Sequence, residues 1–75
     1  MAALELYGTA GCPYTSELRE HLRWRREVFT EYDIDRDSAA RARLASLVPG
    51  QLAVPVLVED GRVTGIGWRG RSCLV

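Results

Sequence analysis

The chain has 75 residues, with ten arginines, no lysine and ten acidic residues, so its formal net charge is zero. This balance gives no overall attraction to nucleic acid or to a membrane surface, and we expect neither as a partner. The longest apolar run, residues 52–58, is far too short to span a bilayer. We expect one domain over residues 1–75 that acts as a monomer. Because the N-terminus enters a strand without the pattern of a signal peptide, we expect a cytoplasmic protein.

The first elements are a strand and a helix joined by a glycine-rich turn. Residues 3–7 alternate in polarity as a partly covered strand does. The helix that follows has Pro13 in its first turn, carries Tyr14, Leu18 and Leu22 on one face, and closes at Arg25-Arg26.

A second strand and a second helix come next. Residues 27–34 are rich in β-branched and aromatic residues, and we expect this strand to lie parallel to the first through a right-handed crossover. Residues 39–48 predict a helix capped by Asp37 or Ser38 and ended by Pro49-Gly50. Its predicted buried positions are Ala40, Leu44, Leu47 and Val48.

The C-terminal third predicts a hairpin and an irregular tail. Residues 54–59 and 62–66 form two antiparallel strands around the turn Asp60-Gly61. The tail, residues 67–75, shows no periodicity. Residues 65–70 spell Gly-x-Gly-x-x-Gly, but a dinucleotide fingerprint needs a following helix and a later acidic residue. We interpret these glycines as tight backbone near the functional site.

The junction of the first strand and the first helix carries the strongest chemical signal. Cys12 stands directly before the helix, and Pro13 suits the first helical position. Unpaired N–H groups and the positive end of the helix dipole stabilise a thiolate, which is the nucleophilic form of cysteine. We therefore predict that Cys12 is reactive and not a buried structural cysteine.

Two motifs resemble the glutaredoxin family. Cys12-Pro13-Tyr14-Thr15 is similar to its Cys-Pro-Tyr-Cys active site, with Thr15 in place of the second cysteine, and Ala53-Val54-Pro55 is similar to its Thr-Val-Pro. The resemblance implies an α/β, thioredoxin-like fold: a four-stranded mixed sheet flanked by helices, with a C-terminal helix that is short or absent. It also implies a cis peptide bond before Pro55, facing Cys12 and turning the Val54 backbone towards an extended peptide ligand.

The same resemblance implies glutathione as a co-substrate and suggests its contacts. Tyr14 would pack beside the bound thiol, unless it only begins the apolar stripe of the helix. Gln51 would bind the glycine carboxylate, unless it is an exposed loop residue. Gly65 and Gly67 stand where the family has two glycines at the γ-glutamyl end.

Two departures weaken the glutathione interpretation. Thr9 stands where the family commonly has a basic residue, and Trp68 follows Gly67 without the family's aspartate. Arg69 or Arg71 could supply one lost charged partner through a bidentate pair. Losing such a contact costs about one to three kcal/mol.

Thr15 cannot form a disulfide, although its hydroxyl can donate a hydrogen bond to the Cys12 sulfur, so we predict monothiol chemistry. Cys12 would attack a disulfide or a mixed glutathione disulfide, and an external thiol would regenerate it. Two hypotheses from other classes are an iron–sulfur carrier that uses Cys12 and glutathione as ligands, and a non-catalytic binding domain. Cys73 is interpreted as an incidental tail residue, with a remote resolving thiol as the alternative. Two cysteines and one histidine are too few for a zinc site, so no metal is expected.

Overall fold

The computed structural model describes residues 3–75. Its elements are β1 (Leu4–Gly8), α1 (Pro13–Trp24), β2 (Thr30–Asp33), α2 (Ser38–Leu47), β3 (Ala53–Val54), β4 (Val56–Glu59), β5 (Arg62–Ile66) and β6 (Cys73–Leu74). Four strands form a mixed sheet in the order β2-β1-β4-β5, and β3 pairs with β6 in a separate two-stranded sheet. β1 is parallel to β2 and antiparallel to β4, which confirms the predicted sheet.

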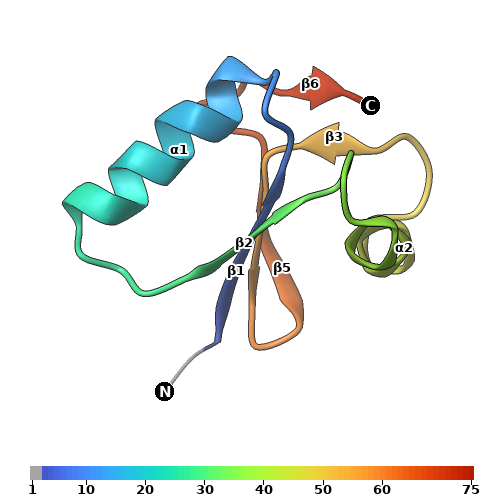
Figure 1. Cartoon of the computed structure of the whole chain (residues 1–75), viewed down its shortest axis with the longest axis horizontal. Helices are drawn as coiled ribbons and strands as arrows, with labels where there is room; N and C mark the ends of the chain where they lie inside the picture. The colour runs from blue at the N-terminus through green and yellow to red at the C-terminus, as the bar shows by residue number, and fades with distance from the viewer. Residues whose placement is uncertain (1–2) are drawn as a thin grey trace.

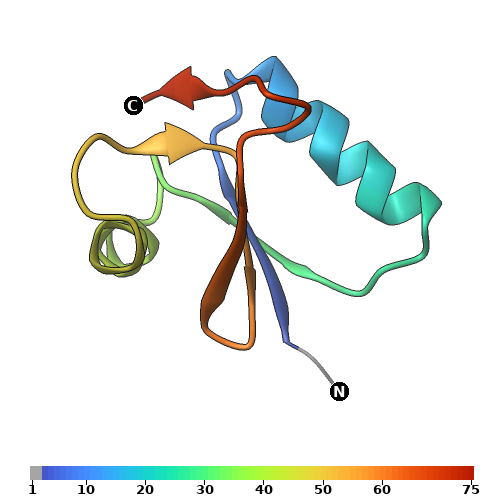
Figure 2. The same ribbon diagram turned by 180° about the vertical axis from the view of Figure 1, so that it is seen from behind.

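The two helices cover opposite faces of the four-stranded sheet (Figure 1 and Figure 2). Side chains alternate between the two faces of a strand, so consecutive residues of β1 contact different helices. Leu6 packs with Leu18 and Leu22 of α1. Tyr7 belongs to the cluster of Ala40 and Leu44 of α2. The fold therefore has one apolar core on each face.

The buried stripe of α1 differs by one residue from the predicted one. Thr15, Leu18 and Leu22 are buried, whereas Tyr14 is half-buried and packs against the other core. The prediction that Tyr14 begins the stripe was therefore wrong, because the i, i+3, i+7 spacing from Thr15 fits the sheet-facing side. In α2 the Asp37 carboxylate accepts a hydrogen bond from the Ala40 N–H at 3.0 Å, which confirms it as the cap.

α1 ends in a left-handed turn that shortens the following strand. Arg26 has φ +58°, Glu27 N–H donates to Leu22 C=O at 3.0 Å and Arg26 N–H donates to Arg23 C=O at 2.9 Å. These two bonds define a Schellman motif with arginine where glycine is usual. Arg26 and Glu27 form this turn, and the Val28 that follows is 90% exposed. β2 therefore begins at Thr30 and not at residue 27 as predicted.

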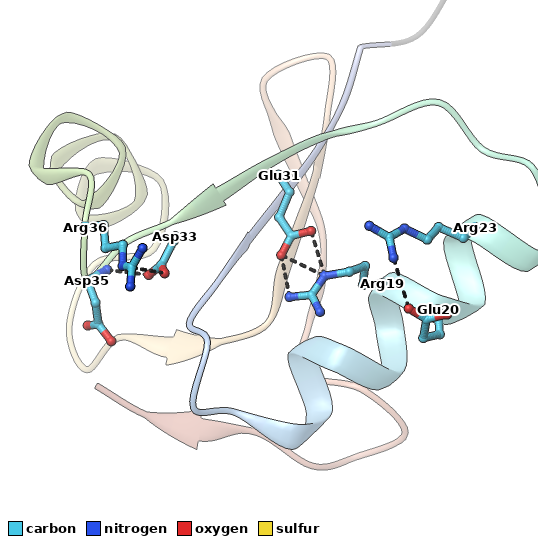
Figure 3. Close-up of polar contacts among 7 residues, drawn as sticks. All are labelled: Arg19, Glu20, Arg23, Glu31, Asp33, Asp35 and Arg36. Atoms are coloured by element: carbon cyan, nitrogen blue, oxygen red, sulfur yellow. Dashed lines mark hydrogen bonds and ion pairs between the residues drawn. The ribbon is translucent and has the colours of Figure 1, made fainter.

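An ion pair joins α1 to β2 (Figure 3). Arg19 Nε donates to Glu31 Oε1 at 2.7 Å, and Arg19 Nη2 donates to Glu31 Oε2 at 2.6 Å. This hydrogen bonding raises the pKa of Arg19 above its usual value, while partial burial opposes the shift. The fork geometry orients the helix on the strand to which it is connected.

The predicted strand 54–59 divides at Pro55. The Val54–Pro55 bond is cis, and β3 leaves the main sheet while β4 continues into it. Proline removes a ladder donor, which is why the strand breaks there. Asp60 and Gly61 both have positive φ, as the predicted hairpin turn requires.

The tail is more ordered than its sequence predicted. Trp68 and Arg71 exchange backbone hydrogen bonds of 2.7 and 3.0 Å around Arg69 and Gly70, which have φ of +53° and +78°. This tight turn sends the last residues back along β3, where they form β6 (Figure 1). The tail therefore contains a turn and a short strand that its lack of periodicity did not indicate, and no C-terminal helix is present within residues 3–75. No helix in this described part is long and apolar enough to cross a membrane.

Candidate active site

Cys12 occupies the N-cap position of α1. Its backbone is extended (φ −92°, ψ +115°), Pro13 is the first helical residue, and no acidic residue lies in the first turn. The turn before it is closed by a hydrogen bond of 3.3 Å from Cys12 N–H to Thr9 C=O. The sulfur therefore stands at the positive end of the helix with no carboxylate in that turn to oppose a thiolate.

The structure joins Cys12 to Cys73 in a disulfide, with the two Cα atoms 6.0 Å apart. The residues are separated by 61 positions in the sequence. The tail turn and the pairing of β6 with β3 bring them together, since Cys73 lies opposite Val54. The sequence left the distance between the two cysteines open, and the structure shows that it is short enough for a bond. The 61 positions between Cys73 and Cys12 gave no sequence signal that the two residues are close in space.

Val54 and Pro55 form the wall against which the disulfide rests. Both lie in the protein interior, and Cys12 Sγ is 3.7 Å from the Val54 carbonyl oxygen. Pro55 C=O accepts a hydrogen bond of 2.7 Å from Gly67 N–H, which fixes the start of the tail beside the cis bond. The backbone of β3 therefore lies next to the sulfur atom of Cys12.

Thr15 makes no hydrogen bond to the Cys12 sulfur in the structure. Its side chain is fully buried, and its hydroxyl has no hydrogen-bond partner among the described residues. The side chain instead faces Gly8, where an added Cβ would lie 2.7 Å from the Thr15 hydroxyl oxygen. Because Gly8 has no side chain, the Thr15 side chain in the first turn of α1 can pack directly against the backbone of β1.

The aromatic residues around the site lie on the α1 side of the tail. Trp68 packs on His21 with ring centroids 4.7 Å apart, and the Arg69 guanidinium lies 5.2 Å from the centre of the Trp68 ring. Tyr14 and Arg71 line a hollow of about 310 Å³ together with Glu17, Trp68 and Arg69. Arg69 and Arg71 therefore line the same hollow as Tyr14. A cationic side chain that binds a carboxylate of a thiol ligand beside Tyr14 would need this position.

Gln51 and Gly67 contact residues of the tail, whereas Gly65 lies within the sheet. Gln51 is exposed, and its amide donates to the Val75 carbonyl oxygen at 3.2 Å. Gly67 has φ +83°, and an added Cβ would lie 2.7 Å from the Arg71 carbonyl oxygen. Gly65 lies in β5 opposite Leu57. Of the positions predicted for glutathione, Gln51 thus contacts the last residue of the chain and Gly67 lies against Arg71 in the tail turn.

The structure adds two groups that the sequence interpretation missed. One is β6 with Val75, whose N–H donates to Leu52 C=O at 3.1 Å. The other is the packing of His21 on Trp68. The short apolar run Cys73-Leu74-Val75 was the available signal for a strand. No such signal existed for His21, because the turn that carries Trp68 has no periodicity.

The sheet order, the cis proline and the cysteine at the helix N-terminus define a thioredoxin-like protein. Two solved structures of the thioredoxin-like protein BC3987 agree. The structure of a point mutant has a TM-score of 0.80 at 30% identity over 92% of this chain and 86% of that chain. The second has a TM-score of 0.74 at 31% identity over 81% and 82%. Glutaredoxin 1 from Francisella tularensis, complexed with cacodylate, shares the fold with a TM-score of 0.65 at 24% identity over 91% and 85%.

The chain belongs to the glutaredoxin family. The family model described as Glutaredoxin matches residues 4–64. A curated relative, "Probable glutaredoxin slr1562" of Synechocystis sp. (strain ATCC 27184 / PCC 6803 / Kazusa), is 34% identical over 65 residues, which is 85% of this chain. The chain spans 60% of that relative's length. The family uses glutathione as a co-substrate. The tail that carries Cys73 lies outside the residues that the family model matches.

No group of three or more histidine, cysteine, aspartate or glutamate side chains is placed to hold a metal ion within residues 3–75. The sulfur atoms of Cys12 and Cys73 are bonded to each other. The chemistry that the arrangement supports directly is therefore the exchange of this disulfide with other thiols.

Proposed function

We propose that this protein is a thiol–disulfide oxidoreductase in which Cys12 is the nucleophile and Cys73 is the resolving thiol. The observation that carries the proposal is the disulfide between a cysteine at a helix N-terminus and a cysteine on a strand held against β3. Membership of the glutaredoxin family supports the reaction class. The tail thiol replaces the second cysteine that Thr15 lacks.

The reaction has two exchange steps. The Cys12 thiolate attacks one sulfur of a substrate disulfide, so a bond to Cys12 Sγ forms, the substrate S–S bond breaks and one half leaves as a thiolate. The Cys73 thiolate then attacks Cys12 Sγ, forms the intramolecular disulfide and releases the second half. The substrate gains two electrons, the protein loses two, and the two thiol protons pass to the released thiolates. An external dithiol, or two thiols, returns the electrons.

The monothiol route differs in its second step. There an external thiol such as glutathione attacks the mixed disulfide, and Cys73 takes no part. The pairing of Val54 with Cys73 favours the intramolecular route, because the fold places the second thiol within bonding distance of Cys12.

Turnover of a small disulfide, bis(2-hydroxyethyl) disulfide, tests the proposal with dithiothreitol as the donor. Cys12→Ser should lower the catalysed rate to the background, and unchanged turnover would refute the nucleophile. Mixed with the disulfide in the absence of dithiothreitol, Cys73→Ser should retain one half of it on Cys12, whereas the wild type should retain none. Retention of the adduct by the wild type would refute the resolving role. Visible absorbance after anaerobic purification would instead indicate the iron–sulfur carrier, and an unreactive Cys12 the binding domain.

A further inference from the structure

The outer face of α1 carries apolar side chains that the fold leaves exposed. Trp24 is 83% exposed, and Val28, which follows the turn at the helix end, is 90% exposed. Trp24 lines a hollow of about 780 Å³ on this face together with His21 and Trp68. In both views α1 lies at the outside of the fold (Figure 1 and Figure 2). Single exposed apolar residues are normal, but a tryptophan beside an aromatic-lined hollow is typical of an interaction site.

The apolar core beneath this face is the thinner of the two. Its buried residues are Leu6, Leu18 and Leu22, whereas eight buried residues form the core on the α2 side. A second hollow, of about 340 Å³, opens between α1 and the sheet and reaches Leu18 and Leu22. His21 and Trp68 line both hollows, so the two hollows adjoin.

The exposed charges along α1 and the turn after it are negative first and positive last. Glu17 and Glu20 are exposed, and so are Arg23, Arg25 and Arg26. Glu20 pairs with Arg23 at 3.2 Å, but Glu17 and Arg25 have no ion-pair partner within residues 3–75. The helix dipole does not account for Glu17, because its effect fades within the first turn, where α1 has no acidic residue. The face therefore carries one unpaired charge of each sign, at opposite ends.

We propose that this face binds a second copy of the chain, with the two α1 helices antiparallel about a twofold axis. A twofold interface joins the same patch on both molecules, so the patch must be complementary to itself. In an antiparallel pair, Glu17 of each copy meets Arg25 of the other. Trp24 lies about two turns after Glu17 on the same stripe of the helix, so Trp24 of each copy enters the hollow of the other beside Glu17 and Trp68. Such a dimer differs from the monomer expected from the sequence.

The size of the face sets the strength of this association. A standard interface covers about 800 Å² of each partner, which is roughly one sixth of the 4918 Å² surface of this chain. The helix has 12 residues and is about 18 Å long, so its face and the tail turn together offer less than that area. We therefore expect a reversible dimer with a dissociation constant of roughly 10–100 µM.

Sedimentation equilibrium of the oxidised protein at low salt, from about 10 to 500 µM, tests the association. In this form Cys12 and Cys73 are bonded to each other, so no thiol is left to link two copies. Trp24→Ala should raise the dissociation constant at least about tenfold. The matched control is Ile66→Ala, since Ile66 is 56% exposed but lies opposite Val56, which belongs to the core on the α2 side. That control should change the constant less than about twofold. A wild type that stays monomeric at the highest concentration would overturn the inference, and so would a Trp24→Ala protein that associates like the wild type.

Two charge reversals test the antiparallel arrangement. Glu17→Arg and Arg25→Glu each place two pairs of like charges in the interface, and each should raise the dissociation constant about tenfold. Mixed in equal amounts, the two variants should form a heterodimer, because one copy is then positive at both positions and the other negative at both. Its dissociation constant should lie within about threefold of the wild-type value. A mixture that associates no more strongly than the separate variants would overturn the antiparallel pairing, and so would single variants that associate like the wild type.

Discussion

Replacing Thr15 by valine should stabilise the oxidised protein. The Thr15 side chain is fully buried and its hydroxyl has no partner among the described residues. An unsatisfied buried hydroxyl costs roughly 1–3 kcal/mol, and valine has nearly the same shape without that cost. Both residues are β-branched, so the helical preference changes little. We expect Thr15→Val to raise the free energy of unfolding by about 1 kcal/mol.

Urea unfolding of the oxidised protein, followed by circular dichroism, measures this change. The matched control is Thr9→Val, because Thr9 is the other buried threonine and its hydroxyl is not a buried atom without a partner. That control should change stability little. A loss of about 1 kcal/mol or more in Thr15→Val would refute the reasoning, since it would mean that the hydroxyl makes a hydrogen bond in the folded protein.

Four further changes test other parts of the structure. Arg26→Gly should stabilise the protein by about 1 kcal/mol in urea unfolding, because glycine adopts the left-handed φ without strain, and a loss would contradict the Schellman turn. Gly67→Ala should weaken the Cys12–Cys73 disulfide in a dithiothreitol titration, because its Cβ would meet the Arg71 carbonyl; an unchanged midpoint would show that the tail does not need this approach. Arg19→Lys should cost about 0.5 kcal/mol by losing the bidentate pair with Glu31, and no change at low salt would contradict that pairing. Oxidation should stabilise the wild type by at most about 4 kcal/mol from closing a separation of 61 residues, whereas Cys73→Ser should not respond to dithiothreitol; a response there would contradict the assigned bond.

The local patterns of the sequence were sufficient for most of the main sheet. Asp60-Gly61 predicted the hairpin turn, and the observed β5 has the predicted bounds. The sequence indicated Asp37 or Ser38 as the cap of α2, and Asp37 takes that position because its short carboxylate reaches an unpaired N–H of the first turn. These features depend on residues only a few positions apart.

Features that depend on distant residues were not predictable in the same way. The separation of 61 residues between Cys12 and Cys73 gives no periodic signal, so their proximity appears only when the tail turn and β6 are placed. Thr15 stands where the family has its second thiol, and its position in the motif therefore suggested a hydrogen bond to the Cys12 sulfur. In the structure it faces Gly8, since the helix turns that position towards β1.

The most direct test of the central claim is the intact mass of the reduced protein after reaction with one equivalent of a disulfide-linked peptide, with Cys12→Ser and Cys73→Ser beside it. If Cys73 resolves Cys12, the wild type should lose two protons without retaining an adduct. Cys73→Ser should then retain one peptide, and Cys12→Ser should do neither. A stable peptide adduct on Cys12 of the wild type, with Cys73 still a free thiol, would contradict the account.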